Sequence, residues 1–435
     1  MSNSFDAALD RARERYATKR PISSEMFERA SVVMPGGSTR SVLDFEPFPF
    51  RIASATGSRI TDVDSHEYVD FLGDYSAGLL GHSPGPVEAA VVATLDRGWS
   101  YGGVHTDEVR FAEAVVDRFT SIEQVRFTNS GTEANLMAIQ LGRHHTRRDR
   151  VVVCDLAYHG GLLYFGHGGE PLLAPFDFAR LRYNDVDDVA RVIDDSTAVV
   201  LVEPMMGAAG CIPATLEFLR ALRSRCDETG TLLVFDEVMT SRMSVGGAQA
   251  RYDVMPDLTT LGKYLAGGMT FGAFGGRADV MGAFDPARGG QLTHGGTFNN
   301  NVVTMAAGAA ALGELLTAQV LDALFDRGES LMARMSEMLD ASPLPLCMSG
   351  MGSLMTIHTV AGPVTSPSDL ADTDSVLKEL LFHELLDRGI YLAPRGYMAL
   401  SAAITDADCE TMLAAIAESI ATITQLGDVP GTTPN

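Results

Sequence analysis

Four short apolar runs in the middle of the chain indicate buried strands. They are RVVVCD (150–155), AVVLVEP (198–204), LLVFDEV (232–238) and the weaker FGAFGG (271–276). Continuous apolar runs of this length are typical of strands buried on both faces, as in a parallel sheet. Between the second and third runs, leucines recur at helical spacing and Gly230 provides a stop signal. This pattern predicts a βαβ unit and an α/β domain.

The flanking regions follow other patterns. Residues 57–72 alternate apolar and polar positions, which predicts antiparallel strands joined by a turn at 62–65. Residues 302–340 are rich in Ala, Leu and Met and predict a long helix. A helix at 374–388, a short strand at 389–393 and a helix at 406–426 then suggest an α+β region. The predicted fold class is therefore α/β, with a large domain around a mainly parallel central sheet and a smaller α+β domain.

The length of the chain supports this division, because 435 residues exceed what a single hydrophobic core usually organises. We predict an N-terminal segment at 1–55 that belongs to the small domain. The large domain is predicted at 56–310 and the C-terminal small domain at 311–435.

Composition narrows the classes of function. The net charge of −23 opposes non-specific binding to nucleic acid or to an anionic membrane, so any phosphate must be held by a local site. The N-terminus resembles no secretory or organelle-targeting segment, and no apolar stretch is long enough to span a membrane. Five scattered cysteines without a CxxC pair fit a reducing compartment. We expect a soluble cytoplasmic protein.

The first candidate site is FTNSGTEANLMAIQLGR (127–143), where a short strand is followed by a helix. Ser130, Gly131 and Thr132 lie at the junction. Free backbone N–H groups and the dipole at a helix N-terminus favour an anion, and the glycine lets a phosphate approach closely. The same residues also fit an ordinary helix N-cap, and this stretch alone leaves both interpretations open.

Asp236 and Lys263 are the next candidates. Asp236 follows an apolar strand at its carboxyl end, where open α/β sheets bind ligands, although it equally fits a cap of the next turn. A carboxylate there is costly unless it meets a cation or hydrogen-bond donors. Lys263, one of only three lysines among 33 basic residues, lies in the glycine-rich run TTLGKYLAGGMTFGAFGG (259–276). Unlike arginine, a buried lysine can become a neutral amine nucleophile.

Several common sites are excluded by their own patterns. A P-loop would need glycine at Asp257 and Ser or Thr at Tyr264, and a dinucleotide fingerprint fails at Pro171. No HExxH or paired-cysteine pattern occurs in the sequence, so no metal site is predicted. A phosphate cradle, a strand-end carboxylate and a lysine, in that order, suit pyridoxal 5′-phosphate (PLP), which needs all three.

Six ordered motifs strengthen this interpretation: SGTEAN (130–135), AYHG (157–160), VEPMMG (202–207), FDEVMTSR (235–242), TTLGKYLAGG (259–268) and GGTFNNN (295–301). Together they resemble the class III aminotransferases of the fold type I PLP enzymes, from about residue 34 to about residue 400. Within that family the chain is similar to the branch of the glutamate-1-semialdehyde aminomutases, and most similar to the β-amino-acid (β-phenylalanine) aminotransferases.

The resemblance implies roles for the residues around the cofactor. Lys263 would form the Schiff base with PLP and then shuttle a proton, and Asp236 would keep the pyridine nitrogen protonated. Tyr158 would stack on one ring face and Val238 would press on the other. Ser130, Gly131 and Thr132 would hold the phosphate, together with Thr297 from a second subunit. A homodimer with a shared active site, in which 56–310 is the PLP-binding domain, is therefore expected.

The resemblance also implies substrate-binding residues, with the segment 1–55 contributing to the substrate pocket. Arg40 and Arg395 would bind the carboxylates of the amino donor and of the keto-acid acceptor through the fork of the guanidinium group. Val42, Tyr75 and Met239 would line the pocket. Many class III relatives carry Gln where Met239 stands, so the preference of those relatives for polar substrates is not expected here.

Two further residues of these motifs are assigned structural roles only. His159 is expected to be a satisfied buried histidine, and Glu203 a strand-end carboxylate. The predicted reaction is transfer of an amino group from an aromatic β-amino acid to 2-oxoglutarate or pyruvate. One rival is the aminomutase reaction on glutamate 1-semialdehyde, which needs the same cofactor residues. The other is a non-catalytic relative, disfavoured by the intact Lys263 and Asp236.

Overall fold

The computed structural model describes residues 2–290 and 292–426, and the chain packs as two compact units. Unit 1 comprises Met1–Ser83, Arg327–Val364 and Ser368–Asn435, and unit 2 comprises Pro84–Asp326 and Thr365–Pro367. Residues 56–83 thus pack with unit 1, whereas the sequence analysis assigned them to the large domain. The division at 55 and 310 remains a prediction, and the end of its last range lies outside the described residues.

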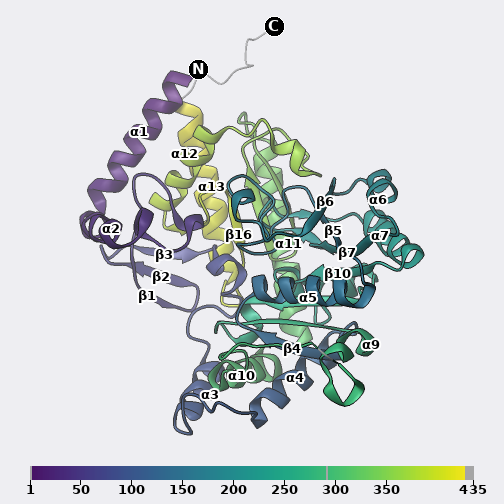
Figure 1. Cartoon of the computed structure of the whole chain (residues 1–435). Coiled ribbons are helices and arrows are strands. Elements are labelled where there is room, and N and C mark those ends of the chain that lie inside the picture. Colours follow the sequence, from purple (N-terminus) through teal and green to yellow (C-terminus); the bar gives the residue numbers. More distant parts are fainter. Residues whose placement is uncertain (1, 291, 427–435) are drawn as a thin grey trace. The chain divides into compact units, whose positions relative to one another are not determined.

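Unit 2 is built on a seven-stranded sheet with the strand order β4-β12-β11-β10-β7-β5-β6 (Figure 1). The strands are β4 (Gln124–Thr128), β5 (Arg150–Cys154), β6 (Asp177–Leu181), β7 (Thr197–Val202), β10 (Leu232–Asp236), β11 (Leu258–Gly262) and β12 (Gly272–Gly276). The buried strands predicted from the apolar runs are confirmed. Only β12 runs antiparallel to both of its neighbours, so FGAFGG is not the parallel strand that its apolar character suggested.

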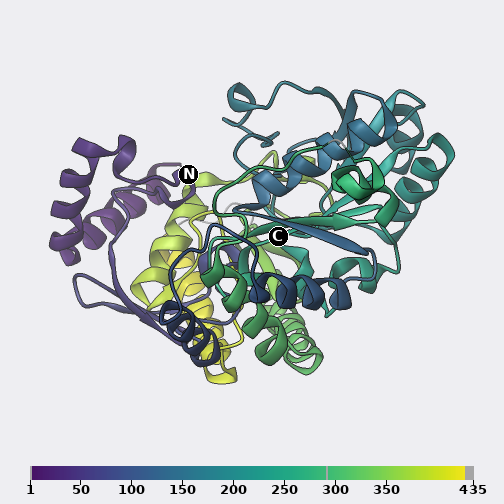
Figure 2. The same cartoon turned by 60° about the horizontal axis from the view of Figure 1, so that its bottom comes forward.

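Helices cover both faces of this sheet (Figure 2). Those of unit 2 are α3 (Gly85–Leu95), α4 (Thr106–Arg118), α5 (Gly131–Thr146), α6 (Val186–Val192), α7 (Leu216–Thr229), α8 (Gly247–Tyr252), α9 (Ala278–Met281) and α10 (Val302–Ala310). The βαβ unit β7-α7-β10 has parallel strands, as predicted, and α7 ends at Gly230 with φ 65°. A short hairpin of β8 (Met205–Met206) and β9 (Ile212–Pro213) follows β7.

The long helix predicted at 302–340 is instead broken. After α10, the segment Ala311–Leu315 forms a π-helical turn, and a second helix, α11 (Ala318–Asp340), begins three residues later. Small residues and leucines continue through the break, so the apolar pattern alone carries no stop signal there. The boundary between the two units falls within α11, after Asp326.

Unit 1 contains two small sheets. One has the order β1-β2-β3-β15 and the other the order β13-β14-β16. Their strands are β1 (Ile52–Thr56), β2 (Arg59–Asp62), β3 (Glu67–Asp70), β13 (Cys347–Met351), β14 (Leu354–His358), β15 (Ile390–Tyr391) and β16 (Tyr397–Ala399). The antiparallel pair β2 and β3 was predicted, with its turn closed by a hydrogen bond from the Ser65 backbone nitrogen to the Asp62 carbonyl.

The helices of unit 1 include two that the sequence analysis did not predict, α1 (Ser2–Lys19) and α2 (Pro21–Val33). The others are α12 (Ser375–Asp387) and α13 (Asp406–Leu426), close to their predicted ranges. Helix α1 is fastened to α12 by bidentate hydrogen bonds from Arg13 to Glu379 at 2.6 and 2.8 Å. Below these ion pairs, Tyr16 of α1 is buried against Phe48 and packs beside Phe382 in one aromatic and aliphatic cluster.

Within the described residues, no individual helix combines the length and apolar character that crossing a membrane requires, although the bent pair formed by Val302–Leu315 and Ala318–Asp340 passes on length and composition alone.

The packing of α5 against the sheet generates a test of the fold. A methyl group added at Gly142 of α5 would overlap Cγ2 of Val199, which is fully buried in β7 and stiff because it is β-branched. Alanine favours helices by about 1 kcal/mol over glycine, yet we expect Gly142→Ala to destabilise the protein by about 1–3 kcal/mol through overpacking. Denaturant unfolding would measure the loss.

Two further variants make this test specific. The cost of Gly142→Ala should shrink in a Val199→Ala background, where the overlapping methyl group is absent. Gly85→Ala at the start of α3 is the control, since no atom lies within 4 Å of its added methyl group. A Gly142→Ala variant as stable as the wild type would contradict this packing.

Candidate active site

The predicted site residues fall into two groups, one in each unit. Unit 2 contains the predicted cofactor residues and Met239, and unit 1 contains the other predicted substrate residues. Since β4, β10 and β11 run in the same direction, their carboxyl ends lie at one edge of the sheet. These ends lead to Ser130, Asp236 and Lys263 respectively, as expected for ligand-binding residues of an open α/β sheet.

Asp236 is buried, with 5% of its surface exposed, at the end of β10. Its Oδ2 accepts hydrogen bonds from the Asn135 amide at 2.8 Å and contacts Nδ1 of His159 at 2.8 Å. Its Oδ1 accepts the Val238 backbone N–H at 3.0 Å. Three neighbouring groups therefore satisfy a carboxylate that burial would otherwise penalise.

Asn135 is itself fixed in orientation. Thr260 of β11 donates its hydroxyl to the Asn135 side-chain oxygen at 2.6 Å, and the Asn135 amide nitrogen also donates to the His159 carbonyl at 3.0 Å. The amide group must therefore point its nitrogen toward Asp236. A strand, a helix and a loop are joined in this way to a single carboxylate.

His159 differs from its expected role as a fully satisfied structural histidine. Its side chain is buried, and one ring nitrogen contacts Asp236 as described above. Within residues 2–290 and 292–426, its other ring nitrogen, Nε2, has no hydrogen-bond partner. A half-satisfied buried imidazole in contact with a buried carboxylate is a polar arrangement built around the acid, not simple packing.

Lys263 follows the carboxyl end of β11 and begins the 3₁₀ turn Lys263–Ala266. Its φ of 55° places it in the left-handed region, which non-glycine residues seldom occupy. Such backbone strain persists where the surrounding structure enforces it, and it is frequent at functional sites. The side chain is partly buried at the edge of the sheet where Asp236 lies.

Both interpretations of the predicted phosphate cradle, an N-cap and an anion-binding helix N-terminus, fit the structure. Ser130 is the N-cap of α5, and its hydroxyl accepts the Glu133 backbone N–H at 3.2 Å. The Glu133 carboxylate in turn accepts the backbone N–H of Asn129, the residue before the N-cap, at 2.9 Å, so the first turn of α5 is fastened to the end of β4. Gly131 and Thr132 form the first turn of α5, so their backbone N–H groups are at the positive end of the helix dipole.

Glycines bring this cradle against Val238. A methyl group built on Gly131 would lie 2.8 Å from Val238 Cγ2, and one on Gly262 would lie 3.2 Å from Val238 Cγ1. The methyl position on Gly262 is also 3.6 Å from the Gly131 backbone nitrogen. The cradle, Val238 and the residue before Lys263 are therefore immediate neighbours, with no room for further side chains between them.

Tyr158 and Glu203 lie on adjoining loops. Tyr158 is 41% exposed, as an aromatic available for stacking must be, and its ring lies 5.4 Å from that of Tyr164. Glu203 is buried and accepts the backbone N–H of Tyr158 at 3.1 Å and that of Gly207 at 2.9 Å. It thus fastens the loop of Tyr158 to the hairpin of Gly207. Met239 lies directly against Gly207, which has no room for a side chain.

Burial raises the pKa of Glu203 to about 7, with the neighbouring Asp236 carboxylate acting in the same direction and His159 opposing it. This carboxyl therefore takes up a proton near neutral pH, which its sequence position alone did not indicate.

In unit 1, the predicted substrate residues form a cluster around Tyr75. The guanidinium carbons of Arg40 and Arg395 lie 5.3 and 5.1 Å from the Tyr75 ring centroid. Tyr397 stacks on Tyr75 with a centroid distance of 5.8 Å and an interplanar angle of 6°, and Arg395 also lies 5.0 Å from the Tyr397 ring. The Tyr75 hydroxyl donates to the Val42 carbonyl at 2.7 Å. Two cations therefore flank one tyrosine.

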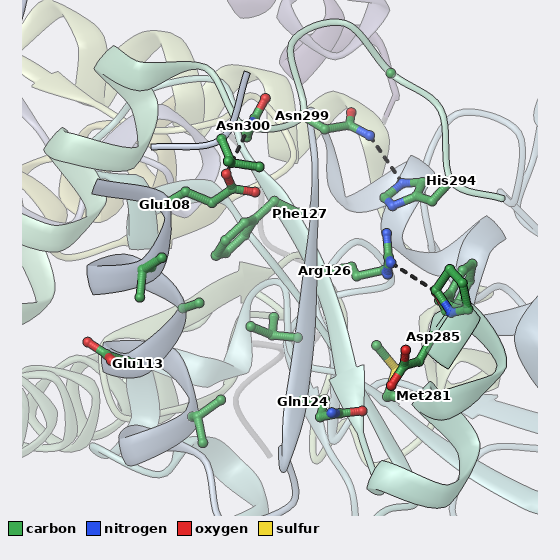
Figure 3. A pocket seen from close by; sticks show the side chains of 18 of the residues that line it. Glu108, Glu113, Gln124, Arg126, Phe127, Met281, Asp285, His294, Asn299 and Asn300 are labelled. Carbon is green, nitrogen blue, oxygen red and sulfur yellow. Dashed lines mark hydrogen bonds between the residues drawn. The ribbon is translucent and has the colours of Figure 1, made fainter. Parts of the chain in front are cut away.

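Thr297 is exposed, in the segment between η8 (Pro286–Arg288) and α10. Its neighbours Gly296 and Asn299 line a cavity of about 860 Å³ between α4, β4 and residues of the ranges 281–286 and 294–300 in unit 2 (Figure 3). There, Asn300 donates to Glu108 at 3.0 Å and Arg126 donates to the Phe284 carbonyl at 3.4 Å. None of the predicted cofactor residues lines this cavity.

The residues present fit PLP. The strand-end carboxylate has neutral donors on one side and can still meet a protonated ring nitrogen, and the capped helix offers N–H groups to a phosphate. Lys263 supplies the amine that the aldehyde of PLP requires. Nε2 of His159 is buried without a hydrogen-bond partner among the described residues, which indicates that the polar groups around Asp236 do more than satisfy its carboxylate.

Sequence reasoning missed three residues: Asn135 and His159 as partners of Asp236 in unit 2, and Tyr397 beside Tyr75 in unit 1. A signal for the first two existed, because a buried strand-end aspartate must have donors and both residues lie in the motifs nearest to it. For Tyr397 no signal existed beyond its position two residues after Arg395.

Comparison with known proteins identifies the family of the chain. The family model for class-III aminotransferases matches residues 43–166 and 171–420. The β-phenylalanine transaminase of Variovorax paradoxus is 48% identical over 419 residues, which is 96% of each chain. A glutamate-1-semialdehyde 2,1-aminomutase of Nitratidesulfovibrio vulgaris is 38% identical over 90% of this chain and 97% of its own.

Solved structures give the same picture. The crystal structure of the β-phenylalanine aminotransferase from V. paradoxus matches with a TM-score of 0.94 at 47% identity, covering 97% of this chain and 99% of the other. A transaminase with PLP bound matches with a TM-score of 0.85 at 32% identity, covering 94% and 99%.

The chain belongs to the class-III aminotransferase family and has the fold of the fold type I PLP enzymes. It is a PLP-dependent transaminase, which takes an amino donor and a keto acid as substrates.

The raised pKa of Glu203 predicts how the stability of the protein depends on pH. Because its pKa in the folded protein is raised above 4.5, its contribution to stability is fully present below about pH 4.5 and is lost as the pH rises through about 7. The side chain introduced by Glu203→Gln does not titrate. The free energy of unfolding of this variant, relative to that of the wild type, should therefore increase as the pH rises through this interval, by up to about 3 kcal/mol. Urea unfolding between pH 4.5 and 8 would measure the difference.

Glu67→Gln, at an exposed glutamate of β3, controls for the loss of one negative charge. A constant stability difference between Glu203→Gln and the wild type across this pH range would contradict the raised pKa.

Proposed function

We propose that the protein transfers the amino group of an aromatic β-amino acid, such as β-phenylalanine, to 2-oxoglutarate or pyruvate. The observation that carries this proposal is the 48% identity to the β-phenylalanine transaminase of V. paradoxus over 96% of both chains. The tyrosine cluster with two arginines supports it, because donor and acceptor both bring a carboxylate and the donor brings an aromatic ring.

In this proposal the residues of unit 2 hold the cofactor and move protons. Bound PLP supplies an electron sink for the bonds at the amine-bearing carbon. The Lys263 amine would hold PLP between turnovers and would carry the proton between the substrate carbon and the cofactor. Asp236 would keep the ring nitrogen protonated, and the contacts of Asn135 and His159 with Oδ2 hold the Asp236 carboxylate in position.

The remaining cofactor contacts in the proposal follow from position. Tyr158 and Val238 would flank the two faces of the ring. The N–H groups of Gly131 and Thr132 and the hydroxyls of Ser130 and Thr132 would hold the phosphate. Glu203 would keep Tyr158 in place through the hydrogen bond to its backbone.

For the substrates, the proposal assigns carboxylate binding to Arg40 and Arg395 of unit 1. Stacking on tyrosine rings restricts both guanidinium groups before a ligand arrives, which lowers the entropy lost on binding. Val42, Tyr75 and Met239 would contact the side chain of the donor, and all three offer apolar surface to a phenyl ring.

The proposal includes a homodimer in the cytoplasm. Two exposed apolar side chains line the cavity of Figure 3, Val104 at 92% and Val109 at 56% exposed, and Phe298, 59% exposed, directly precedes the lining residue Asn299. Apolar surface beside a hollow of this size favours a protein partner, and the exposed Thr297 is available to reach a second subunit. The buried cysteines fit a reducing compartment.

The second candidate reaction is the isomerisation of glutamate 1-semialdehyde, favoured by the 38% identity to the aminomutase of N. vulgaris. Both reactions use the same cofactor residues, so the substrates must separate them.

The activity test uses both substrates. The PLP-loaded wild type should convert β-phenylalanine with 2-oxoglutarate into a β-keto acid and glutamate, measured by chromatography. Lys263→Ala should lower this rate at least about 10³-fold, because it removes the proton carrier. Its long-wavelength cofactor absorbance should also change, whereas that of Asp236→Ala should persist. Conversion of glutamate 1-semialdehyde alone, with no β-phenylalanine turnover, would establish the aminomutase instead.

The subunit test changes one exposed residue. Val104→Glu should weaken the dimer at least about tenfold, because it places a charge in an apolar interface, and sedimentation velocity would measure this. Val32→Glu, at an equally apolar residue of α2 that is 85% exposed, is the matched control. If both variants dimerise like the wild type, the surface around Val104 is not the subunit interface.

A further inference from the structure

The two arginines over Tyr75 differ in what else they contact. Nη1 of Arg40 donates to Oδ1 of Asp74 at 2.8 Å. By contrast, no carboxylate of residues 2–290 or 292–426 lies within 4.0 Å of the Arg395 guanidinium. Arg40 is therefore paired with a carboxylate of the chain itself, whereas Arg395 contacts tyrosine rings and no carboxylate of the described residues.

Arg40 does not need Asp74 to hold its position. Its guanidinium already lies over the Tyr75 ring, and the Tyr75 hydroxyl is bonded to the carbonyl of Val42, two residues after Arg40. The ring and the segment that carries Arg40 are thus fixed to each other. The contribution of Asp74 is a negative charge, which a ligand carboxylate would duplicate.

The backbone presents Asp74 in an uncommon conformation. Gly73, Asp74, Tyr75 and Ser76 all have left-handed φ values, of 54°, 43°, 52° and 75°. The Asp70 carboxylate accepts the N–H groups of Leu72 and Gly73 at 2.9 and 3.0 Å and so enforces the turn. Aspartate and asparagine tolerate this conformation better than other residues that carry a side chain. The charge of Asp74 can therefore be removed by Asp74→Asn without disturbing the turn.

We propose that Asp74 is a positioning residue that acts as an internal counter-ion of Arg40 and competes with substrate carboxylates for its guanidinium group. Carboxylates then bind more readily at Arg395 than at Arg40, and Asp74 sets the difference. This inference rests on the proposed function, which assigns carboxylate binding to both arginines.

The test measures binding without turnover. Two unreactive carboxylates, 3-phenylpropanoate and glutarate, are titrated calorimetrically into the PLP-loaded dimer or monomer as purified. The variants are Asp74→Asn, Arg40→Met, Arg395→Met and the double variant Asp74→Asn/Arg40→Met. Glu410→Gln, which removes a carboxylate from the exposed pair with Arg334 in the same unit, is the matched control.

Asp74→Asn should bind at least one probe roughly two- to fivefold more tightly, as expected when an exposed ion pair no longer competes. The gain should disappear in the Arg40→Met background and be absent from Glu410→Gln. In steady-state assays the same variant should lower KM while leaving kcat unchanged. A purely structural role of Asp74 would not tighten binding.

The outcomes separate the two claims. If Arg40→Met weakens binding but Asp74→Asn leaves it unchanged or weaker, the counter-ion role is wrong and the carboxylate role of Arg40 stands. If neither Arg40→Met nor Arg395→Met weakens binding of either probe, the proposed substrate roles are wrong as well. Should Asp74→Asn fold poorly, Asp74→Gly repeats the test, because glycine accepts the same φ.

Discussion

The structure of unit 2 depends on one buried carboxylate. Asp236 lies at the end of a fully buried strand, where an unpaired charge would be strongly unfavourable, and an amide, an imidazole and a backbone N–H satisfy it. Each of these donors comes from a different segment, so the loop of His159, helix α5 and the turn after β10 are held in register by the same acid. Thr260 extends this network to β11, the strand that leads to Lys263.

Strained backbone marks the chemistry in both units. Lys263 in unit 2 and the residues Asp74, Tyr75 and Ser76 in unit 1 adopt left-handed conformations although none of them is a glycine. In each case neighbouring contacts enforce the conformation, by close packing of glycines around Val238 in one and by the Asp70 carboxylate in the other. Strain that is enforced in this way indicates that the direction of the side chain matters more than the local backbone energy.

Much of the fold was predictable because the signals were local. Buried strands such as β7 and β10 are recognisable in the sequence as apolar runs, and α7 ends at a glycine as its sequence predicts. The antiparallel direction of β12 was not predictable, since an apolar run rich in glycine looks the same in either direction. The break before α11 was missed because the helical pattern continues through it. Helix α1 was missed because it is rich in charged side chains while single residues such as Tyr16 make the buried contacts. Helix α2 was missed because its apolar residues form no buried stripe, and its buried residue is Ser23.

The site followed a similar rule. Lys263, Asp236 and the cradle at Ser130 could be named from motifs, whereas Asn135 and His159 are tied to Asp236 only through the folded chain. The pair of Asp74 and Arg40 joins residues 34 positions apart, and no periodicity connects them.

The division of the chain into two separately packed units suggests a route for changing its substrate range. The residues assigned to the cofactor lie in unit 2, and the arginines and tyrosines assigned to the substrate lie in unit 1, with Met239 as the exception. Libraries confined to residues 40–42, 74–75 and 395–397 would therefore vary substrate preference while leaving the hydrogen bonds around Asp236 untouched. Stability lost in such libraries would arise in the core of unit 1, where it can be compensated without altering the cofactor residues.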